Sequence, residues 1–344
     1  MEITGPMNSS IFNFSQYPKA LMAALLAVFI TILSGACFLK LTDNMPAPMF
    51  SNNLSLDEKF RFLRINKRLQ ADYIVLGSST GLNNVPSEAM LEHPKINGNY
   101  LNYSAWGLNM EGHLYYWNFI KEIVRPRVVI IPIDVGGFNN WEDKIPDFNY
   151  PDVKRYLNGA SPLWYYFKYH KSALGERIGL VLRHRKMNDT QVSLKFDRAG
   201  GVPIHVAEES EITRKKWKDE VDAKRYTESA YEGLDKLLAS LKQNGIIAVV
   251  AQQPLREHYK EGEPGLGLIK DHWDRVSVIA EQNGAYFFNM QDILPEDPGL
   301  FSDSSHLNEW AAKEFVKELL RRMEREGIFE KAGSLDPVQL STAR

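Results

Sequence analysis

The chain has 344 residues, 44% of them hydrophobic, so it can bury a sizeable core, and disorder over its whole length is excluded. Its 41 basic and 43 acidic side chains nearly cancel, which leaves no overall field to attract a polyanion, and we expect no nucleic-acid partner. The only cysteine, Cys37, excludes an intrachain disulfide, a zinc site with several thiolates and a cysteine redox pair.

The first predicted element is an apolar helix that follows an N-terminal tail over residues 1–18. Residues 20–39 carry no charged side chain, and Lys19 and Lys40 stand at the two ends of this run. Because about twenty helical residues span the hydrocarbon core of a bilayer, we predict a single-pass transmembrane anchor over residues 19–41. The lipid bilayer is then a partner of the chain.

Two alternatives to an uncleaved anchor stay open for this helix. It could be removed as a signal peptide, or Cys37 could carry a lipid, since Ser34 to Cys37 loosely resembles a bacterial lipobox without its usual leucine. The flanking lysines balance, so charge does not fix the orientation in the membrane. We expect the domain that follows the anchor to lie outside the cytoplasm.

Residues 42–70 are predicted to form a short stalk and one helix. The stalk contains Pro46 and Pro48, and residues 55–58 have the spacing of a capping box, from which a helix should run to about Leu69. Its apolar positions should pack on the domain, with contact to the membrane surface as the alternative. Its basic residues should lie on a solvated face; they are Lys59, Arg64 and Lys67.

Five short apolar runs follow, each apolar on both alternating faces, as expected for strands buried on two sides. Helical patterns separate most of them, which predicts an α/β fold with a central parallel five-stranded sheet and helices on both faces. Such sheets bind ligands at the carboxyl ends of their strands. The runs are 72–76, 99–103, 127–134, 246–252 and 285–289.

About 110 residues separate the third run from the fourth, too many for a plain crossover connection. We predict that residues 138–225 form a mostly helical insertion over the strand ends, inside a domain that covers residues 71–330.

The aromatic cluster at 164–169 could stack on sugar rings or belong to a core, and the basic run at 183–186 could hold an anionic polymer or be a solvated helix end. Residues 331–344 should be a disordered tail.

A turn of small residues, Gly77 to Gly81, directly follows the first run and should project Ser79 from the strand end. A serine hydroxyl becomes a nucleophile when a base takes its proton, and small neighbours leave backbone N–H groups free to face an oxyanion. Phosphate binding or simple helix capping are the alternatives. A nucleotide site is hard to sustain, because neither Gly-x-Gly-x-x-Gly nor a Lys-Ser/Thr ending follows.

Asp303 and His306 lie three residues apart, just before a helix expected from Glu309 to Met323. This spacing lets the carboxylate accept the imidazole Nδ1–H, fix the tautomer and leave Nε2 to face a serine from elsewhere in the fold. The alternative is a capping turn in which Asn308 is the N-cap and His306 is exposed.

Taken together, the order of strand, Gly-x-Ser turn, α/β body and Asp-x-x-His before the last helix resembles the SGNH (GDSL-like) hydrolase and acyltransferase superfamily. The resemblance covers residues 71–325 in outline, with specific matches in short blocks. It implies a flavodoxin-like three-layer α/β/α fold, with Ser79 as nucleophile, Asp303 as orienting acid and His306 as base. We expect no cofactor, and no metal, since the remaining histidines show no metal-ligand spacing.

The segment Asn102 to Gly107, after the second run, looks like the second block of that family. The resemblance implies an oxyanion hole made by the backbone N–H groups of Ser79 and Gly107. A glycine needed only for a tight turn is the alternative for this position.

The third block departs from the family. Asp134 to Gly137 stands where Gly-x-Asn-Asp is usual, so the oxyanion-hole asparagine is missing, and Asn109, Asn139 or Asn140 are the candidates to replace it. Loss of one such donor typically costs about a hundredfold to a thousandfold in turnover. The first block also has Ser78 where hydrolases commonly have aspartate.

Both departures resemble membrane-anchored relatives that act on cell-envelope polymers, such as alginate acetylation proteins and the D-alanyl transfer proteins of teichoic acid modification. The resemblance implies a serine acyl esterase or O-acyltransferase that acts on a cell-envelope or exported polysaccharide, with envelope biosynthesis proteins as further partners. The alternative is a catalytically inactive protein of the same fold that binds glycan or scaffolds an assembly system.

Overall fold

The structure is a computed structural model in which the chain divides into two compact units, Met1–Pro46 and Ala47–Arg344. The residues that it describes are 17–41, 45–67, 69–96, 99–138, 146–169, 174–205, 226–255, 265–295, 297–303 and 305–335. The predictions for residues 1–16 and 336–344 therefore lie outside the described residues, and so do Asn139 and Asn140. Residues 331–334 of the predicted disordered tail are helical.

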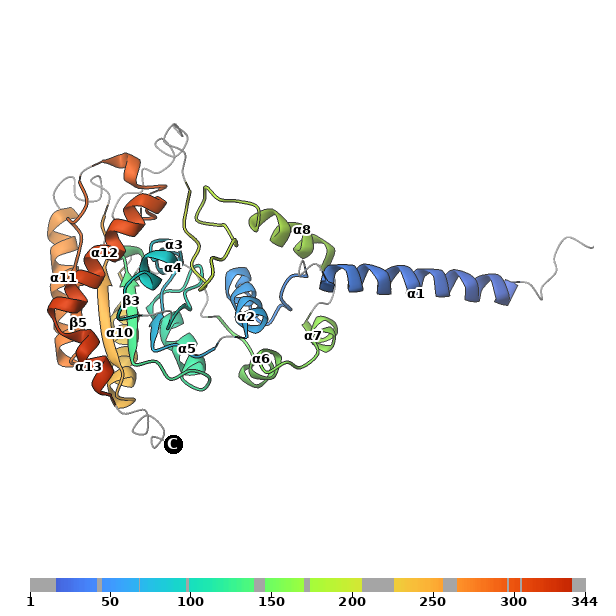
Figure 1. Cartoon of the computed structure of the whole chain (residues 1–344), viewed down its shortest axis with the longest axis horizontal. Coiled ribbons are helices and arrows are strands. Elements are labelled where there is room, and N and C mark those ends of the chain that lie inside the picture. The colour runs from blue at the N-terminus through green and yellow to red at the C-terminus, as the bar shows by residue number, and fades with distance from the viewer. Residues whose placement is uncertain are drawn as a thin grey trace, which may run out of the picture. The chain divides into compact units, whose positions relative to one another are not determined.

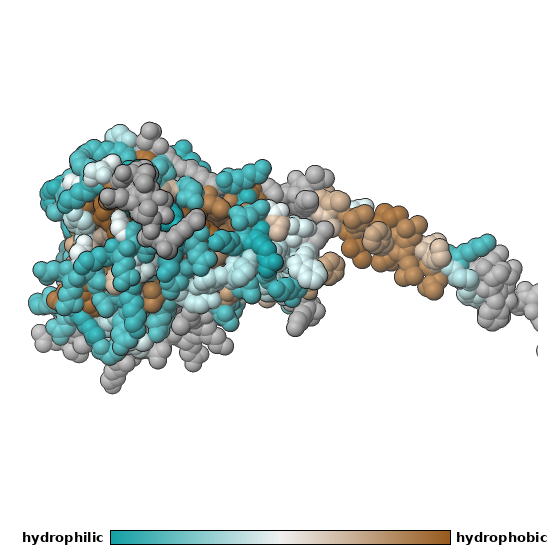
Figure 2. Space-filling model, turned by 90° about the horizontal axis from the view of Figure 1, so that it is seen from below, coloured by the Kyte–Doolittle hydropathy of each residue, from teal (hydrophilic) through white to brown (hydrophobic). Residues whose placement is uncertain are grey.

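The first unit contains one long helix, α1 (Tyr17–Leu41). Its segment Tyr17–Phe38 is long and apolar enough to cross a membrane, and none of it is buried within the structure. Apolar side chains cover most of the face of this helix that Figure 2 shows. The hydroxyl of Thr31 donates to the carbonyl of Ala27 at 2.9 Å, so this polar group is satisfied inside the helix.

A five-stranded parallel sheet forms the centre of the second unit, in the order β2-β1-β3-β4-β5. Its central strands are rich in Val and Ile and buried on both faces, as expected for strands covered by helices on two sides. The predicted α/β fold with a parallel five-stranded sheet is confirmed. The strands are β1 (Tyr73–Val75), β2 (Tyr100–Asn102), β3 (Val128–Ile133), β4 (Ile247–Gln252) and β5 (Tyr286–Asn289).

The helices around the sheet form two groups (Figure 1). Helix α12 contacts both α4 and α13, and α10 contacts both α5 and α11. The chain order reverses between β1 and β3, and with right-handed crossovers this reversal puts the two groups on opposite faces and opens a crevice at the carboxyl ends of these strands. The helices are α3 (Ser79–Asn83), α4 (Ser87–Leu91), α5 (Met110–Ile120), α10 (Glu228–Gln243), α11 (Gly265–Gln282), α12 (Glu309–Arg325) and α13 (Ile328–Ser334).

Helix α2 (Leu54–Asn66) differs from its prediction at both its start and its charged face. Its N-cap is Asn53, whose Oδ1 accepts the N–H of Leu56 at 3.0 Å, so the expected capping box over residues 55–58 does not form. Lys59 is buried instead of solvated, and its ammonium donates to the carbonyl of Asn102 at 2.8 Å and to that of Gly200. Burial lowers the Lys59 pKa to about 7.

Three helices lie within the predicted insertion: α6 (Tyr150–Leu157), α7 (Pro162–Tyr169) and α8 (Leu174–His184). Two ion pairs hold α8 and the residue after it against α2. Arg177 of α8 binds Asp57 at 2.7 Å, and Arg185, directly after the helix, binds Glu58 at 2.5 Å. Arg185 therefore belongs neither to a solvated helix end nor to a polymer site, since both members of its pair are largely buried. Residues 186–205 continue without regular helix along the domain.

Candidate active site

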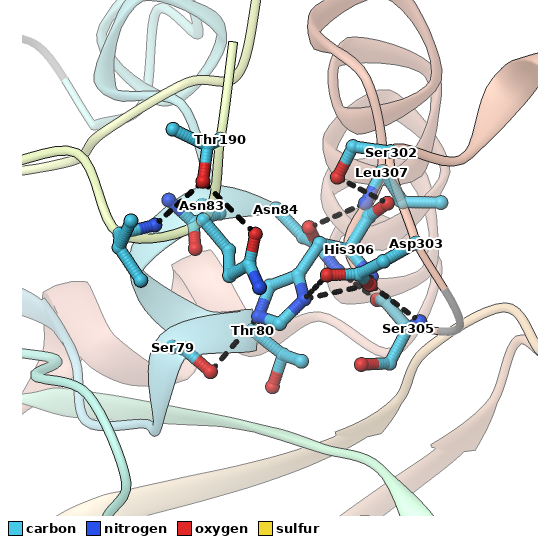
Figure 3. A network of polar contacts seen from close by, with 12 residues as sticks. Ser79, Thr80, Asn83, Asn84, Thr190, Ser302, Asp303, Ser305, His306 and Leu307 are labelled. Carbon is cyan, nitrogen blue, oxygen red and sulfur yellow. Dashed lines mark hydrogen bonds and ion pairs between the residues drawn. The ribbon is translucent and has the colours of Figure 1, made fainter. Parts of the chain in front are cut away.

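Three side chains from opposite ends of the domain form a continuous hydrogen-bonded chain (Figure 3). The hydroxyl of Ser79 lies 2.8 Å from His306 Nε2, although the two residues are 227 positions apart in sequence. The other ring nitrogen, Nδ1, lies 2.8 and 2.7 Å from the two carboxylate oxygens of Asp303. This is the geometry in which a base can take the hydroxyl proton while a carboxylate fixes its tautomer.

Ser79 is the first residue of α3, which begins at the carboxyl end of β1. Ser78 caps the helix through its hydroxyl, which accepts the N–H of Thr80 at 3.3 Å, so the next serine projects from the helix start. The turn has no room for larger residues: a Cβ at Gly77 would lie 2.9 Å from Gly81 Cα, and a Cβ at Gly81 would lie 2.7 Å from Ser104 Oγ. Both glycines are needed for this close packing.

Asp303 and His306 belong to a tight turn before α12. The carboxylate of Asp303 accepts the backbone N–H groups of Ser305 at 2.9 Å and His306 at 2.8 Å, in addition to the imidazole N–H. Asn308 also caps α12, with its Oδ1 2.9 Å from the N–H of Ala311. The capping turn and the acid–base pair, which the sequence offers as alternatives, are therefore present in one structure, and His306 is buried rather than exposed.

Electrostatics keep the Asp303 carboxyl ionised. Burial alone would raise its pKa, but the charge and hydrogen bond of His306, together with the N–H groups of Ser305 and His306, outweigh burial and hold the pKa below its usual range. At neutral pH an anion therefore faces Nδ1. An anion in this place stabilises the imidazolium that forms when Nε2 takes a proton.

Asn84 connects the helix of the nucleophile with the loop of the base. Its amide nitrogen donates to the carbonyl of Ser305 at 3.0 Å and to the side chain of Gln253, and its oxygen accepts the N–H of Leu307 at 2.9 Å. Asn84 thus holds both neighbours of His306. Its own position is the C-cap of α3, which starts with Ser79, so it sets the separation of hydroxyl and imidazole.

Replacing Asn84 with alanine should lower kcat for an ester substrate about tenfold to a hundredfold and leave KM nearly unchanged, because a shift of about 1 Å in a catalytic group has an effect of this size. The unfolding free energy should fall by about 1–3 kcal/mol, since the part-buried Ser305 carbonyl and the buried Leu307 N–H lose their partner. Steady-state kinetics and chemical denaturation measure the two effects.

The matched control is Asn83→Ala. Asn83 is equally buried, but its amide donates to the carbonyl of Val202 at 2.7 Å rather than to the loop of the base. We expect a similar loss of stability with little loss of kcat. Equal kcat values for the two variants would contradict the positioning role of Asn84.

The structure gives less support to the predicted oxyanion hole than to the triad. Gly107 has φ +62°, a left-handed conformation that explains the glycine, and it lies in the loop between β2 and α5. Its role as an oxyanion donor stays a prediction, and so does that of the Ser79 N–H. Asn109, one candidate for the missing asparagine, is the N-cap of α5, with its oxygen 2.8 Å from the N–H of Gly112.

Asp134 directly follows β3 and is the first residue of the third block, residues 134–137. Its Oδ1 accepts the N–H of Gly137 at 2.9 Å. Burial raises the pKa of this carboxyl, against the opposing effects of Gly137, His306 and Thr80. A second acidic group therefore lies within electrostatic range of the His306 imidazole.

The segment after α8 joins the two halves of the site. Val202 donates its N–H to the carbonyl of Leu82 on α3 at 2.8 Å, and the carbonyl of Ile204 accepts the N–H of Glu309 at the start of α12 at 2.9 Å. The imidazole Nδ1 of His205 contacts the carboxylate of Glu309. The insertion thus contacts the helix that begins with Ser79 and the helix that follows His306.

Asn84 and Gln253 are site residues that the sequence did not single out, and Asn102 was noted there only as the start of the second block. Asn102 donates to the carbonyl of Gly81 at 2.9 Å, and so fixes α3 to the end of β2. The sequence signal for Asn84 was the pair of adjacent asparagines, Asn83 and Asn84, after the small-residue turn. Buried amides need hydrogen-bond partners, and these can come from distant parts of the chain. In the described part of the chain no group of three or more His, Cys, Asp or Glu side chains could hold a metal ion.

Comparisons with known proteins found similarity among solved structures but not among protein families or curated proteins. No protein-family profile matches the chain, and no curated protein matches it. Among solved structures, the chain is similar to the crystal structure of a "putative acylhydrolase" from Bacteroides fragilis NCTC 9343, with 9% sequence identity and a TM-score of 0.39 over 77% of this chain and 95% of that one. A similarity of this level carries no argument about activity or substrate.

Proposed function

We propose that this chain is a membrane-anchored serine acyl esterase or O-acyltransferase of the SGNH type. The observation that carries the proposal is the contact of 2.8 Å between Ser79 Oγ and His306 Nε2, with Asp303 on the opposite ring nitrogen. A hydroxyl, an imidazole and a carboxylate in this order form the arrangement that acyl transfer requires.

The proposed reaction proceeds in two halves. Ser79 Oγ attacks the carbonyl carbon of an ester while His306 Nε2 takes the hydroxyl proton, and the carbonyl oxygen becomes an oxyanion that backbone N–H groups stabilise. The C–O bond to the alcohol then breaks, and the imidazolium returns its proton to the leaving oxygen. In the second half, water or a sugar hydroxyl gives its proton to His306 and attacks the acyl carbon. The bond from this carbon to Ser79 Oγ then breaks, and the imidazolium returns the proton to Oγ.

An acylated cell-envelope or exported polysaccharide is the proposed substrate class. The apolar helix α1, which is long enough to span a membrane, and the resemblance of the first and third blocks to membrane-anchored envelope acyltransferases support it. The domain would lie outside the cytoplasm, where such polymers are modified, with envelope biosynthesis proteins as partners.

A test of this function uses the full chain in detergent and a small aryl ester such as 4-nitrophenyl acetate. Brief incubation followed by intact-mass measurement should show one added acetyl group, on the peptide that contains Ser79, and addition of an acceptor oligosaccharide should speed its loss if the enzyme is a transferase. Absence of any acyl adduct under conditions where the protein is folded would overturn the proposal.

The alternative is a protein of the same fold that binds or scaffolds glycan without turnover. It is favoured by the third block, where Asp134 replaces the usual pattern and Asn109 serves as an N-cap. In this case Ser79→Ala would leave the cellular phenotype intact, whereas an enzyme would lose its function.

A further inference from the structure

Helix α7 exposes two large aromatic side chains that the function above does not use. Trp164 is 66% exposed and Phe167 is 82% exposed, whereas Tyr165 and Tyr166 between them are buried. A spacing of three places Trp164 and Phe167 on one face of the helix. Aromatic side chains of this size normally bury most of their surface, so this face is built for contact with something outside the domain.

The buried side of α7 packs on the segment through which the chain enters the domain. The ring of Phe50 lies 5.4 Å from that of Tyr165 and 5.3 Å from that of Tyr169, between centroids. Phe50 is only nine positions beyond Leu41, the last residue of α1. Nine residues reach at most about 30 Å, and a connection of this length permits α7 to reach the surface of a membrane that α1 crosses.

Basic side chains accompany the aromatic face. Lys168, next to Phe167, and Arg155 of α6 both bind the carboxylate of Asp152, and both remain substantially exposed. Two cations on one carboxylate leave a positive surplus beside the aromatic residues. Trp and Phe next to Lys and Arg are the composition of a helix that lies in the headgroup region of an anionic bilayer.

We propose that the face of α7 formed by Trp164 and Phe167 inserts into the interfacial region of the bilayer that α1 spans. This inference rests on the membrane anchor of the proposed function, but not on its chemistry. The aromatic rings enter the boundary between headgroups and acyl chains, while the cations stay at the phosphate level. A second contact besides α1 then fixes the orientation of the domain on the membrane, since α7 is held to the domain core through Phe50, Tyr156 and Tyr165.

The experiment uses the full chain in nanodiscs that contain anionic lipid and lipid with a nitroxide on the acyl chain near the headgroup. In a Cys37→Ser background, an environment-sensitive fluorophore is attached at Phe167→Cys or, as the matched control, at Val278→Cys. Val278 is 51% exposed on α11, on the other side of the domain from α7 (Figure 1). We expect the nitroxide lipid to quench the probe at 167 at least about threefold more strongly than the probe at 278.

A third sample labels the native Cys37, which lies in α1 and reports the anchor itself. If Cys37 is quenched and position 167 is quenched no more than position 278, the proposal is wrong while the anchor stands. If Cys37 is not quenched, both the anchor and this proposal fail. If lipid does not quench position 167 but a soluble polysaccharide shields it from aqueous iodide, the aromatic face binds glycan and the membrane contact is disproved. Acylation of Ser79 is measured separately, so its failure does not affect this result.

Discussion

Replacing Ser79 with alanine is expected to abolish covalent labelling by a fluorophosphonate probe and to lower ester turnover about a thousandfold or more. The physical reason is the position of its hydroxyl, 2.8 Å from His306 Nε2, which makes it the one serine in the turn with a base to take its proton. Removal of the hydroxyl takes away the atom to which the acyl group is transferred. In-gel fluorescence measures the labelling, and release of 4-nitrophenol measures the turnover.

Ser78→Ala is the control for this experiment, because Ser78 is the preceding residue and its hydroxyl caps α3 and contacts the Thr80 hydroxyl at 2.9 Å. Loss of an N-cap should cost about 1 kcal/mol of stability and leave labelling in place. Equal labelling of the wild type and Ser79→Ala would rule out the nucleophile. Circular dichroism should show that both variants are folded.

Replacing Asp303 with asparagine is expected to lower turnover about ten-thousandfold with little change in the fold. An asparagine Oδ1 can still accept the N–H groups of Ser305 and His306, so the turn persists. The side chain, however, loses the negative charge that faces Nδ1 and stabilises the imidazolium. The His306 ring is then free to adopt the tautomer that points a proton at Ser79, in which Nε2 cannot act as a base.

The pH profile tests the charge of Asp303. The pKa of Asp303 lies below its usual range in the folded protein, so its carboxylate stays charged from pH 5 to 9. It contributes stability above its unfolded pKa, and this stability is lost only as the pH falls through the lower folded pKa. Any loss of wild-type activity between pH 8 and 5 therefore does not report protonation of Asp303.

Asp297→Asn is the matched control for Asp303→Asn. Asp297 lies in the same connection between β5 and α12, and its carboxylate likewise accepts a backbone N–H, that of Gly299 at 2.7 Å. It has no contact with the imidazole among the interactions of the described residues. We expect unchanged turnover for this variant, and a comparable loss in both variants would show that the effect of Asp303 is structural.

The sequence by itself determined the elements whose signals are local. Continuous apolar runs identify all five strands, because a strand buried on both faces needs apolar residues at successive positions. An uncharged run of twenty residues identifies α1 for a similar reason, since its length matches a bilayer. The pairing of Asp303 with His306 could also be predicted from the sequence, because the two residues lie three positions apart in one turn.

Only the tertiary structure decided which polar groups meet across the fold. Lys59 reads as a surface residue of an amphipathic helix, yet it is buried because the carbonyls of Asn102 and Gly200 surround its ammonium. Helix α2 begins after the N-cap Asn53 and not at the predicted capping box, because the Asn53 side chain also donates to the carbonyl of Trp106, 53 residues away. Asn84 positions the loop of the base through hydrogen bonds to residues more than 160 positions away in the sequence.

The same distinction holds for the site. Sequence predicts that a serine follows β1 and that a histidine precedes α12, but the separation of 2.8 Å between them is set by strand order and by the hydrogen bonds of Asn84. Apolar periodicity is readable because it repeats along the chain. A hydrogen bond between distant residues leaves no such repeat, and so it exists only once the sheet has brought its partners together.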